Sequence, residues 1–240
     1  MGLSGVWFTG VPHLKSLPTR LSSRKAQSGF TLVEIAIVLV IIGLLLGGVL
    51  KGQELIENGR VKNAANDMNG ISAAYNSYLD RYRKLPGDDG PIATLTARGG
   101  SWATAGITAG TNDGVVAINA AQTFTGAAVE GTAFFQHLRA SGFITGNPGD
   151  VGANALPVNA WGGRLGVTNV AVQGRPAARL LTCLGSVPGK AAAALDVQLD
   201  DGQPNNGTLR ATQGANNAAP GAAAAAYDEA QSYTICRDLG

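Results

Sequence analysis

The sequence predicts an α+β protein with a long N-terminal α-helix, membrane-spanning in its first half, packed on a head that contains an antiparallel β-sheet. Residues 30–50 are almost entirely apolar, and residues 51–85 repeat apolar side chains every three or four positions. Residues 86–240 alternate short apolar segments with turn clusters, and the 34 glycines of the chain favour a loop-rich head. Residues 1–29 form a basic leader. We therefore expect a leader, a membrane helix, its amphipathic continuation and a globular head.

The apolar run extends from Phe30 to Leu50, where Thr31 and Glu34 are the only polar residues. At about 1.5 Å per residue, a helix of this length spans the roughly 30 Å hydrocarbon core of a bilayer. A buried core helix is the alternative. The run is apolar on every face, which favours a membrane span.

Charge is distributed unevenly, although the net charge of the chain is only +2. The leader contains Lys15, Arg20, Arg24 and Lys25 and no acid, just ahead of the apolar run. Lys and Arg beside a membrane span stay on the cytoplasmic side, so the head is expected outside the cytoplasm. The small net charge gives no reason to expect nucleic acid as a partner, and no basic patch with interleaved aromatic residues is evident.

Glu34 is an unusual residue for a membrane helix. A carboxylate near a helix start in hydrocarbon costs on the order of 2–3 kcal/mol unless it is paired, which suggests a functional role. The alternative is an acid that reaches back to the lipid headgroups, since Glu34 lies near one end of the span. The residue alone leaves both interpretations open.

A specific signature surrounds this acid: a basic leader, then Ser28-Gly29-Phe30-Thr31-Leu32-Val33-Glu34, then an unbroken hydrophobic helix. It resembles the signature of the type IV prepilin family, so a pilin-like fold is expected. The resemblance implies that a membrane aspartyl peptidase cuts after Gly29 and N-methylates Phe30. It also implies that Glu34 pairs with the terminal amine of a neighbouring subunit, or with its own, inside a filament.

The resemblance further implies a structural subunit of a type IV pilus, either a major or a minor pilin. Its partners would be other copies or other pilins, the prepilin peptidase and methyltransferase, and an inner-membrane assembly platform. The precursor would span the bacterial inner membrane once, with its head in the periplasm, before entering an extracellular pilus or a periplasmic filament. A type II secretion pseudopilin is the nearest alternative, although the large Gly-, Ala- and Asn-rich head favours a pilin. Adhesion could belong to such a head.

A membrane-anchored periplasmic binding domain that does not polymerise is the alternative from another class. An enzyme is not expected, because no nucleophile–base pair or phosphate loop is evident. The chain has two histidines, of which His13 lies in the leader and His137 lies beside an apolar helix face. An anchored hydrolase would have to depend on His137, which is better explained as structural.

Apolar residues continue at helical spacing beyond the span as far as Leu85-Pro86-Gly87, where Pro and Gly end a helix. They predict a stem packed against the head through Val61, Ala64 or Ala65, Met68, Ile71, Tyr75, Tyr78 and Tyr82. Four glycines have small-xxx-small spacing, which suits close helix approach, although Gly is also common in membrane helices: Gly43, Gly47, Gly48 and Gly52.

In the head, residues 130–142 predict a short helix with Gly142 after its C-terminus. Residues 218–226 predict an exposed low-complexity loop, with a short helix in its alanines as the alternative. Four segments have strand character: 114–119, 165–173, 179–184 and 232–238.

Cys183 and Cys236 both fall in the compartment that the topology places outside the cytoplasm, so a disulfide is expected. Free thiols are the alternative. Such a bond would close a loop whose entropy stabilises the fold by on the order of 4 kcal/mol. The resemblance supports it, because many pilins close a carboxy-terminal region in this way.

The segment Asp196 to Gly207 holds hard oxygen ligands of the kind that calcium prefers, at Asp200, Asp201 and Asn205, with Asn206 beside them. It does not match the EF-hand pattern, and the same residue types form ordinary turns. The sequence favours the turn, so no cofactor is expected.

Overall fold

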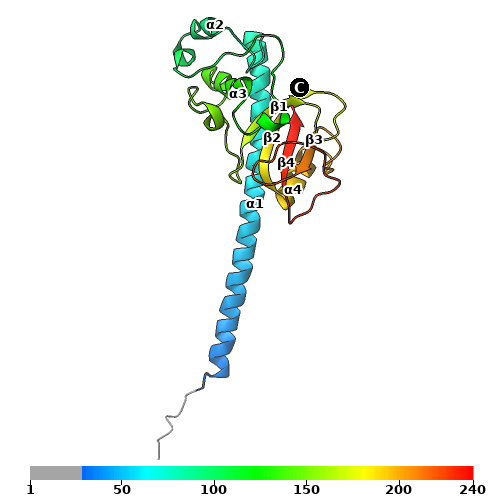
Figure 1. Ribbon diagram of the computed structural model, residues 1–240. Helices are drawn as coiled ribbons and strands as arrows, with labels where there is room; N and C mark the ends of the chain where they lie inside the picture. The colour runs from blue at the N-terminus through cyan, green and yellow to red at the C-terminus, as the bar shows by residue number, and fades with distance from the viewer. Residues whose placement is uncertain (1–28, 240) are drawn as a thin grey trace, which may run out of the picture. The chain divides into compact units, whose positions relative to one another are not determined.

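The computed structural model of the protein describes residues 29–239 (Figure 1). The expected leader lies outside this range except for Gly29, and His13 lies outside it as well. The elements follow in the order α1 (Leu32–Tyr82), α2 (Ile92–Thr96), η1 (Gly100–Ala103), η2 (Ala120–Gln122), α3 (Val129–Ala140), η3 (Gly152–Ala155), β1 (Leu165–Val170), β2 (Arg179–Pro188), α4 (Gly189–Leu199), β3 (Leu209–Gln213) and β4 (Ser232–Asp238). The expected α+β, pilin-like architecture is confirmed.

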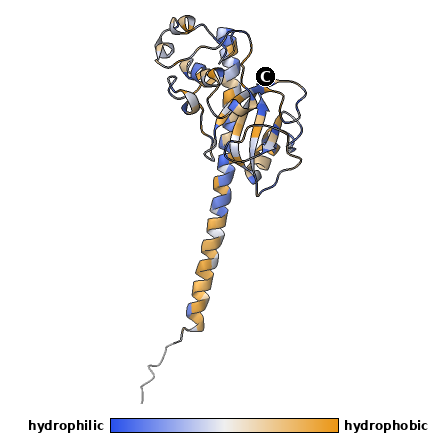
Figure 2. Cartoon of the chain, in the orientation of Figure 1, coloured by the Kyte–Doolittle hydropathy of each residue, from blue (hydrophilic) through white to orange (hydrophobic). Residues whose placement is uncertain are grey.

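The described chain divides after Gly48 into two compact units, and the boundary falls within α1. In the first unit the helix is apolar, as Figure 2 shows, and its side chains are exposed. By length and composition, α1 is the one helix within residues 29–239 that could cross a membrane. A fully exposed apolar surface of this extent requires a cover, either lipid or other protein.

In the second unit, α1 has one buried face. The predicted stripe is confirmed, since Val61, Ala64, Met68, Ile71 and Tyr78 are buried. These residues belong to one core cluster that also contains side chains of α3, α4 and the sheet. The helix ends slightly earlier than the Pro-Gly signal, at Tyr82, because Arg83 takes a left-handed conformation with φ 54°.

The sheet has four antiparallel strands in the order β1-β2-β4-β3. One face joins the core around α1 through residues such as Leu184, Ile235 and Ala211. The opposite face carries Cys183, which is directly opposite Cys236 in the register of β2 and β4. The two cysteines form a buried disulfide, so the predicted pairing is confirmed and no free cysteine remains.

Helix α3 is almost wholly buried, and its polar side chains bind the loops around it. The carboxylate of Glu130 accepts hydrogen bonds from the backbone of Thr111 and Ala117. Gln136 accepts a hydrogen bond from Thr108 and donates to the carbonyl oxygens of Gly106 and Asp150. The end of the helix follows the expectation, because Gly142 is left-handed and Phe143 donates back to Leu138.

Two acids follow the end of α1 and anchor the loops around it. Asp88 and Asp89 are buried. Asp89 accepts hydrogen bonds from the Tyr78 hydroxyl at 2.7 Å and from the Arg98 guanidinium at 2.8 Å. Asp88 accepts from the backbone amides of Asp113 and Gly114. These contacts fasten the first head loops to the end of α1.

Some predicted elements differ from the structure. The strand expected at residues 114–119 is wrong: Val116 and Ile118 are buried alternately, but the amides bond to side chains such as Glu130 and not to a strand. The strand expected at 165–173 ends at Val170, and the one expected at 179–184 continues to Pro188. Residues 218–226 form a loop without a helix. Helix α4 and strand β3 were not predicted.

The disulfide gives a first prediction. Replacing Cys183 and Cys236 together by alanine is expected to lower the free energy of unfolding by about 4 kcal/mol, because the unfolded chain loses a closed loop. Urea unfolding of the full chain in detergent measures this change. Wild-type protein in a reducing agent should lose the same amount, and a loss below about 1 kcal/mol would contradict the entropic account.

His137 gives a prediction for pH. Its Nδ1 accepts the Gly87 amide at 3.0 Å and its Nε2 contacts the Thr108 carbonyl oxygen at 2.8 Å, so the ring is neutral. Burial lowers the pKa of His137 to about 4. In the unfolded chain His137 takes up a proton near pH 6.5, whereas in the folded chain it stays neutral down to about pH 4. The free energy of unfolding therefore falls as the pH drops from 6.5 toward 4.

Between pH 7.5 and pH 5, this effect is expected to remove about 2 kcal/mol from the free energy of unfolding. Urea unfolding at the two pH values measures it. The His137→Gln variant should show a smaller dependence on pH, whatever its absolute stability. An unchanged dependence in the variant would assign the effect to other groups.

Candidate processing and assembly site

The start of α1 is fixed by a reciprocal pair of side-chain contacts. The Thr31 hydroxyl accepts the Glu34 amide at 3.2 Å. In return, Glu34 Oε2 accepts the Thr31 amide at 2.8 Å and the Thr31 hydroxyl at 2.9 Å. This is a capping box, which satisfies backbone donors that a helix start leaves unpaired. It makes Leu32 the first helical residue and orients the Glu34 carboxylate toward the chain entering the helix.

Only one oxygen of Glu34 takes part in this box. No hydrogen bond to Oε1 is formed within the described chain, so one side of the carboxylate can accept a further donor. An unpaired carboxylate among apolar side chains costs free energy in a membrane. A cation that approaches the first turn would therefore find a positioned acceptor.

Gly29 and Phe30 lie outside the helix. Phe30 is 84% exposed, so the peptide bond between the two residues precedes the helix in open backbone. A Cβ atom placed on Gly29 would meet nothing within 4 Å. The fold of this chain therefore does not require glycine at this position, and a requirement would come from an enzyme that binds the segment closely.

Thr31 caps the helix, a role that its place as one of two polar residues in the apolar run does not predict. The spacing Thr-x-x-Glu before an apolar run is a signature of the capping box and could have identified it. The glycines at 43, 47, 48 and 52 have open space around them, and α1 continues through them. Both interpretations of these glycines therefore stay open.

The two acids among the candidate calcium ligands lie close together in the structure. Asp200 and Asp201 lie with the buried Asp196 in a group whose ligand atoms are within 4.8 Å of one another, and Asp201 and the third candidate, Asn205, are exposed. Asp196 accepts the Tyr227 hydroxyl at 2.6 Å, and burial raises its pKa. Asp200 accepts the Leu209 amide and Asp201 the Gln203 amide, as turn residues do. The expectation of a turn without a cofactor stays a prediction, with calcium as its weaker alternative.

His137 does not provide a catalytic base. Both ring nitrogens are occupied by backbone groups, and the side chain is buried beside Tyr78 and Trp102. The hydrolase hypothesis therefore loses the residue on which it depended. That the chain is not an enzyme stays a prediction.

Comparison with known protein families gives one match. The family described as prokaryotic N-terminal methylation motif matches residues 24–50, a range that contains Gly29, Phe30, the capping box and the apolar part of α1. The head lies outside the matched range. No curated protein matches the chain. The N-terminal segment of this chain, which includes Gly29, Phe30 and the capping box, therefore carries the type IV prepilin-type signature.

Proposed function

We propose that this chain is a structural subunit of a type IV pilus, cleaved after Gly29, N-methylated at Phe30 and polymerised through α1. The methylation motif supports a secreted subunit of the pilin or pseudopilin kind. The observation that carries the finer proposal is Glu34, a carboxylate with one free oxygen at the start of an otherwise apolar, exposed helix.

Cleavage would create a cation next to this carboxylate. The new amine at Phe30 would lie four residues before Glu34, outside the capping box, and N-methylation would leave its positive charge in place. A neighbouring subunit, or the same one, could then supply the donor for Glu34 Oε1. Pairing would offset the cost of placing both charges in an apolar environment, and it would favour the register in which they meet.

The exposed apolar half of α1 would be covered by the membrane before assembly and by other subunits in the filament. The apolar N-terminal helix and the motif fit a membrane-anchored precursor. Before assembly, lipid would cover the side chains of residues 30–50. On extraction by an inner-membrane assembly platform, the α1 helices of other copies would replace lipid, which exchanges one apolar contact for another at little net cost.

The loop-rich head favours a pilin or minor pilin over a type II secretion pseudopilin. Figure 1 shows long connections between the short strands and helices of residues 83–239. Such loops place variable side chains on a surface while the sheet and α1 hold the scaffold. Adhesion would be a suitable role for this surface.

The assembly role of Glu34 can be separated from its capping role. The Glu34→Gln variant retains a capping acceptor but loses the charge, so it is expected to be inserted and cleaved normally yet to enter filaments at least about tenfold less well. Immunoblots of sheared filaments against membrane fractions measure this ratio. Glu54→Gln is the matched control, since Glu54 is an exposed acid on the same helix that pairs with Lys51.

The Thr31→Val variant tests the capping box itself. It keeps the acid but removes the hydroxyl, and it should cost only about 1 kcal/mol of helix stability with filament assembly largely retained.

The Glu34→Gln variant decides the proposal. If it assembles as well as wild type, the charge has no role in polymerisation and the proposed function loses its main support.

Processing gives an independent prediction. Intact-mass analysis of the protein from its native host should show a chain that begins at Phe30 and carries one methyl group on its terminal nitrogen. The Gly29→Leu variant should retain the leader, because a larger side chain blocks close approach to the backbone. A wild-type protein that keeps its leader would instead indicate an anchored domain that does not polymerise.

A further inference from the structure

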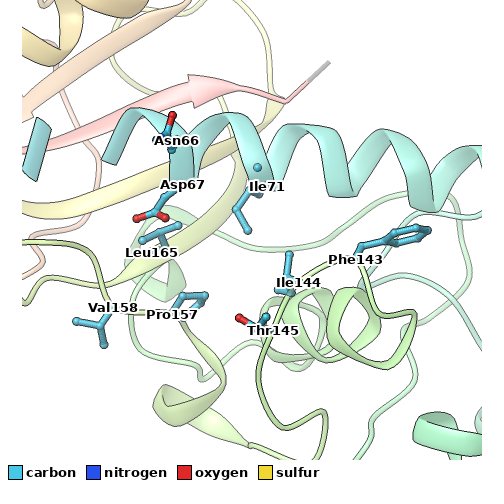
Figure 3. Close-up of a pocket in the computed structure, with 10 residues that line it drawn as sticks. Asn66, Asp67, Ile71, Phe143, Ile144, Thr145, Pro157, Val158 and Leu165 are labelled. Carbon is cyan, nitrogen blue, oxygen red and sulfur yellow. The ribbon is translucent and has the colours of Figure 1, made fainter. Parts of the chain in front are cut away.

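A groove opens between the second half of α1 and the head loops. It has a volume of about 280 Å³. Figure 3 shows α1 on one side, with Asp67 and Ile71, and the loop residues on the other. The walls are mixed in character. Apolar side chains such as Ile71, Ile144 and Val158 lie beside the polar residues Asn66, Asp67 and Thr145.

Asp67 is the charged residue of this groove. Its carboxylate forms no hydrogen bond or ion pair with any part of the chain that the structure describes. Asp67 is exposed by surface area, and partial loss of solvent in the groove raises the pKa of its carboxyl group without an opposing contact. An acid in these surroundings favours a cation with an apolar stalk, such as a lysine or arginine side chain.

The other acids of α1 after Gly48 have partners. Glu54 pairs with Lys51, Glu57 with Arg60 and Asp80 with Arg83. Among the cations of the same stretch, Arg81 lies over the Tyr82 ring. Lys62 is exposed and has no ion pair or hydrogen bond within residues 29–239. Within the described residues, the second half of α1 therefore leaves Asp67 and Lys62 without a hydrogen bond or an ion pair.

Asp67 and Lys62 of one chain are not placed to form an ion pair with each other. They are five residues apart, which at 3.6 residues per turn places them about 140° apart around the helix. We propose that the Asp67 groove receives Lys62 from a second copy of this chain. The lysine stalk lies along Ile71, Ile144 and Val158, and its ammonium group pairs with the Asp67 carboxylate.

The placement of donor and acceptor determines the kind of assembly. Because the groove and Lys62 lie on different faces of α1, each copy offers an acceptor to one neighbour and a donor to another. Such a heterologous contact extends into an open chain and does not close as a symmetric dimer. The inference rests on the proposed function, since it extends the assembly role of α1 from the membrane segment to the segment that carries the head.

Charge exchange in the full chain tests this pairing in cells. The single variants Asp67→Lys and Lys62→Asp are each expected to lower the content of sheared filaments by at least about tenfold, with normal insertion and cleavage. The double variant should recover to within about twofold of wild type, because the pair is restored between copies. Asp80→Lys is the control, since Asp80 is highly exposed and contacts only Arg83 on the surface.

A stability measurement separates an interface role from a structural one. The Asp67→Asn variant should keep the melting temperature of the monomer in detergent, because Asp67 is exposed and has no hydrogen bond or ion pair to lose within the described residues. The same variant should lose filaments. A lowered melting temperature together with lost filaments would assign Asp67 to the fold and overturn the inference.

Cross-linking locates the contact directly. A photoreactive phenylalanine analogue at Val158, which is 65% exposed at the groove, should join the peptide containing Lys62 of another copy in assembled filaments. Cross-links only to other segments or other proteins would contradict the inference, as would a double variant without recovery.

The two proposals can fail separately. If the single charge variants assemble normally while Glu34→Gln does not, the Asp67–Lys62 pairing fails and the proposed function stands. If Glu34→Gln also assembles normally, the proposed function itself fails.

Discussion

The apolar half of α1 cannot remain in water, and this constraint governs the rest of the molecule. Residues 30–50 expose large aliphatic side chains on every side of the helix. Their cover has to come from lipid or from other proteins, because an apolar surface of this extent is unfavourable in water. One acid, Glu34, interrupts this surface, four residues after the position at which cleavage would create an amine. The chemistry of the site therefore follows from the cost of placing a charge in an apolar environment.

The second half of α1 packs against a head that has little regular structure. The sheet covers one face of the helix, and α3 extends the same core. The long loops depend on polar side chains of α3 and on Asp88 and Asp89 for hydrogen bonds that a sheet would otherwise supply. Buried polar groups of this kind fix one arrangement of the loops, because each lost contact leaves an unpaired group in the core.

Much of the fold could be predicted from the sequence, and the failures have physical reasons. Regular periodicity in α1 and α3 and the strands around the cysteines gave correct elements, because burial follows a regular spacing there. The alternation at Val116 and Ile118 was misleading, since an irregular segment can bury every second residue without a strand partner. The contacts of Thr31 and Asp89, and the position of Asp67 in its groove, arise from residues that the fold brings together, which periodicity does not reveal.

Electron microscopy with antibodies against the head tests the central claim most directly. If lipid and other copies of α1 cover the apolar helix in turn, gold label should decorate filaments on wild-type cells and be absent after deletion of the gene. Label along the shaft would indicate a major subunit, and label at the tip a minor one. Label confined to the cell envelope, with filaments unchanged by the deletion, would contradict the claim that this helix polymerises.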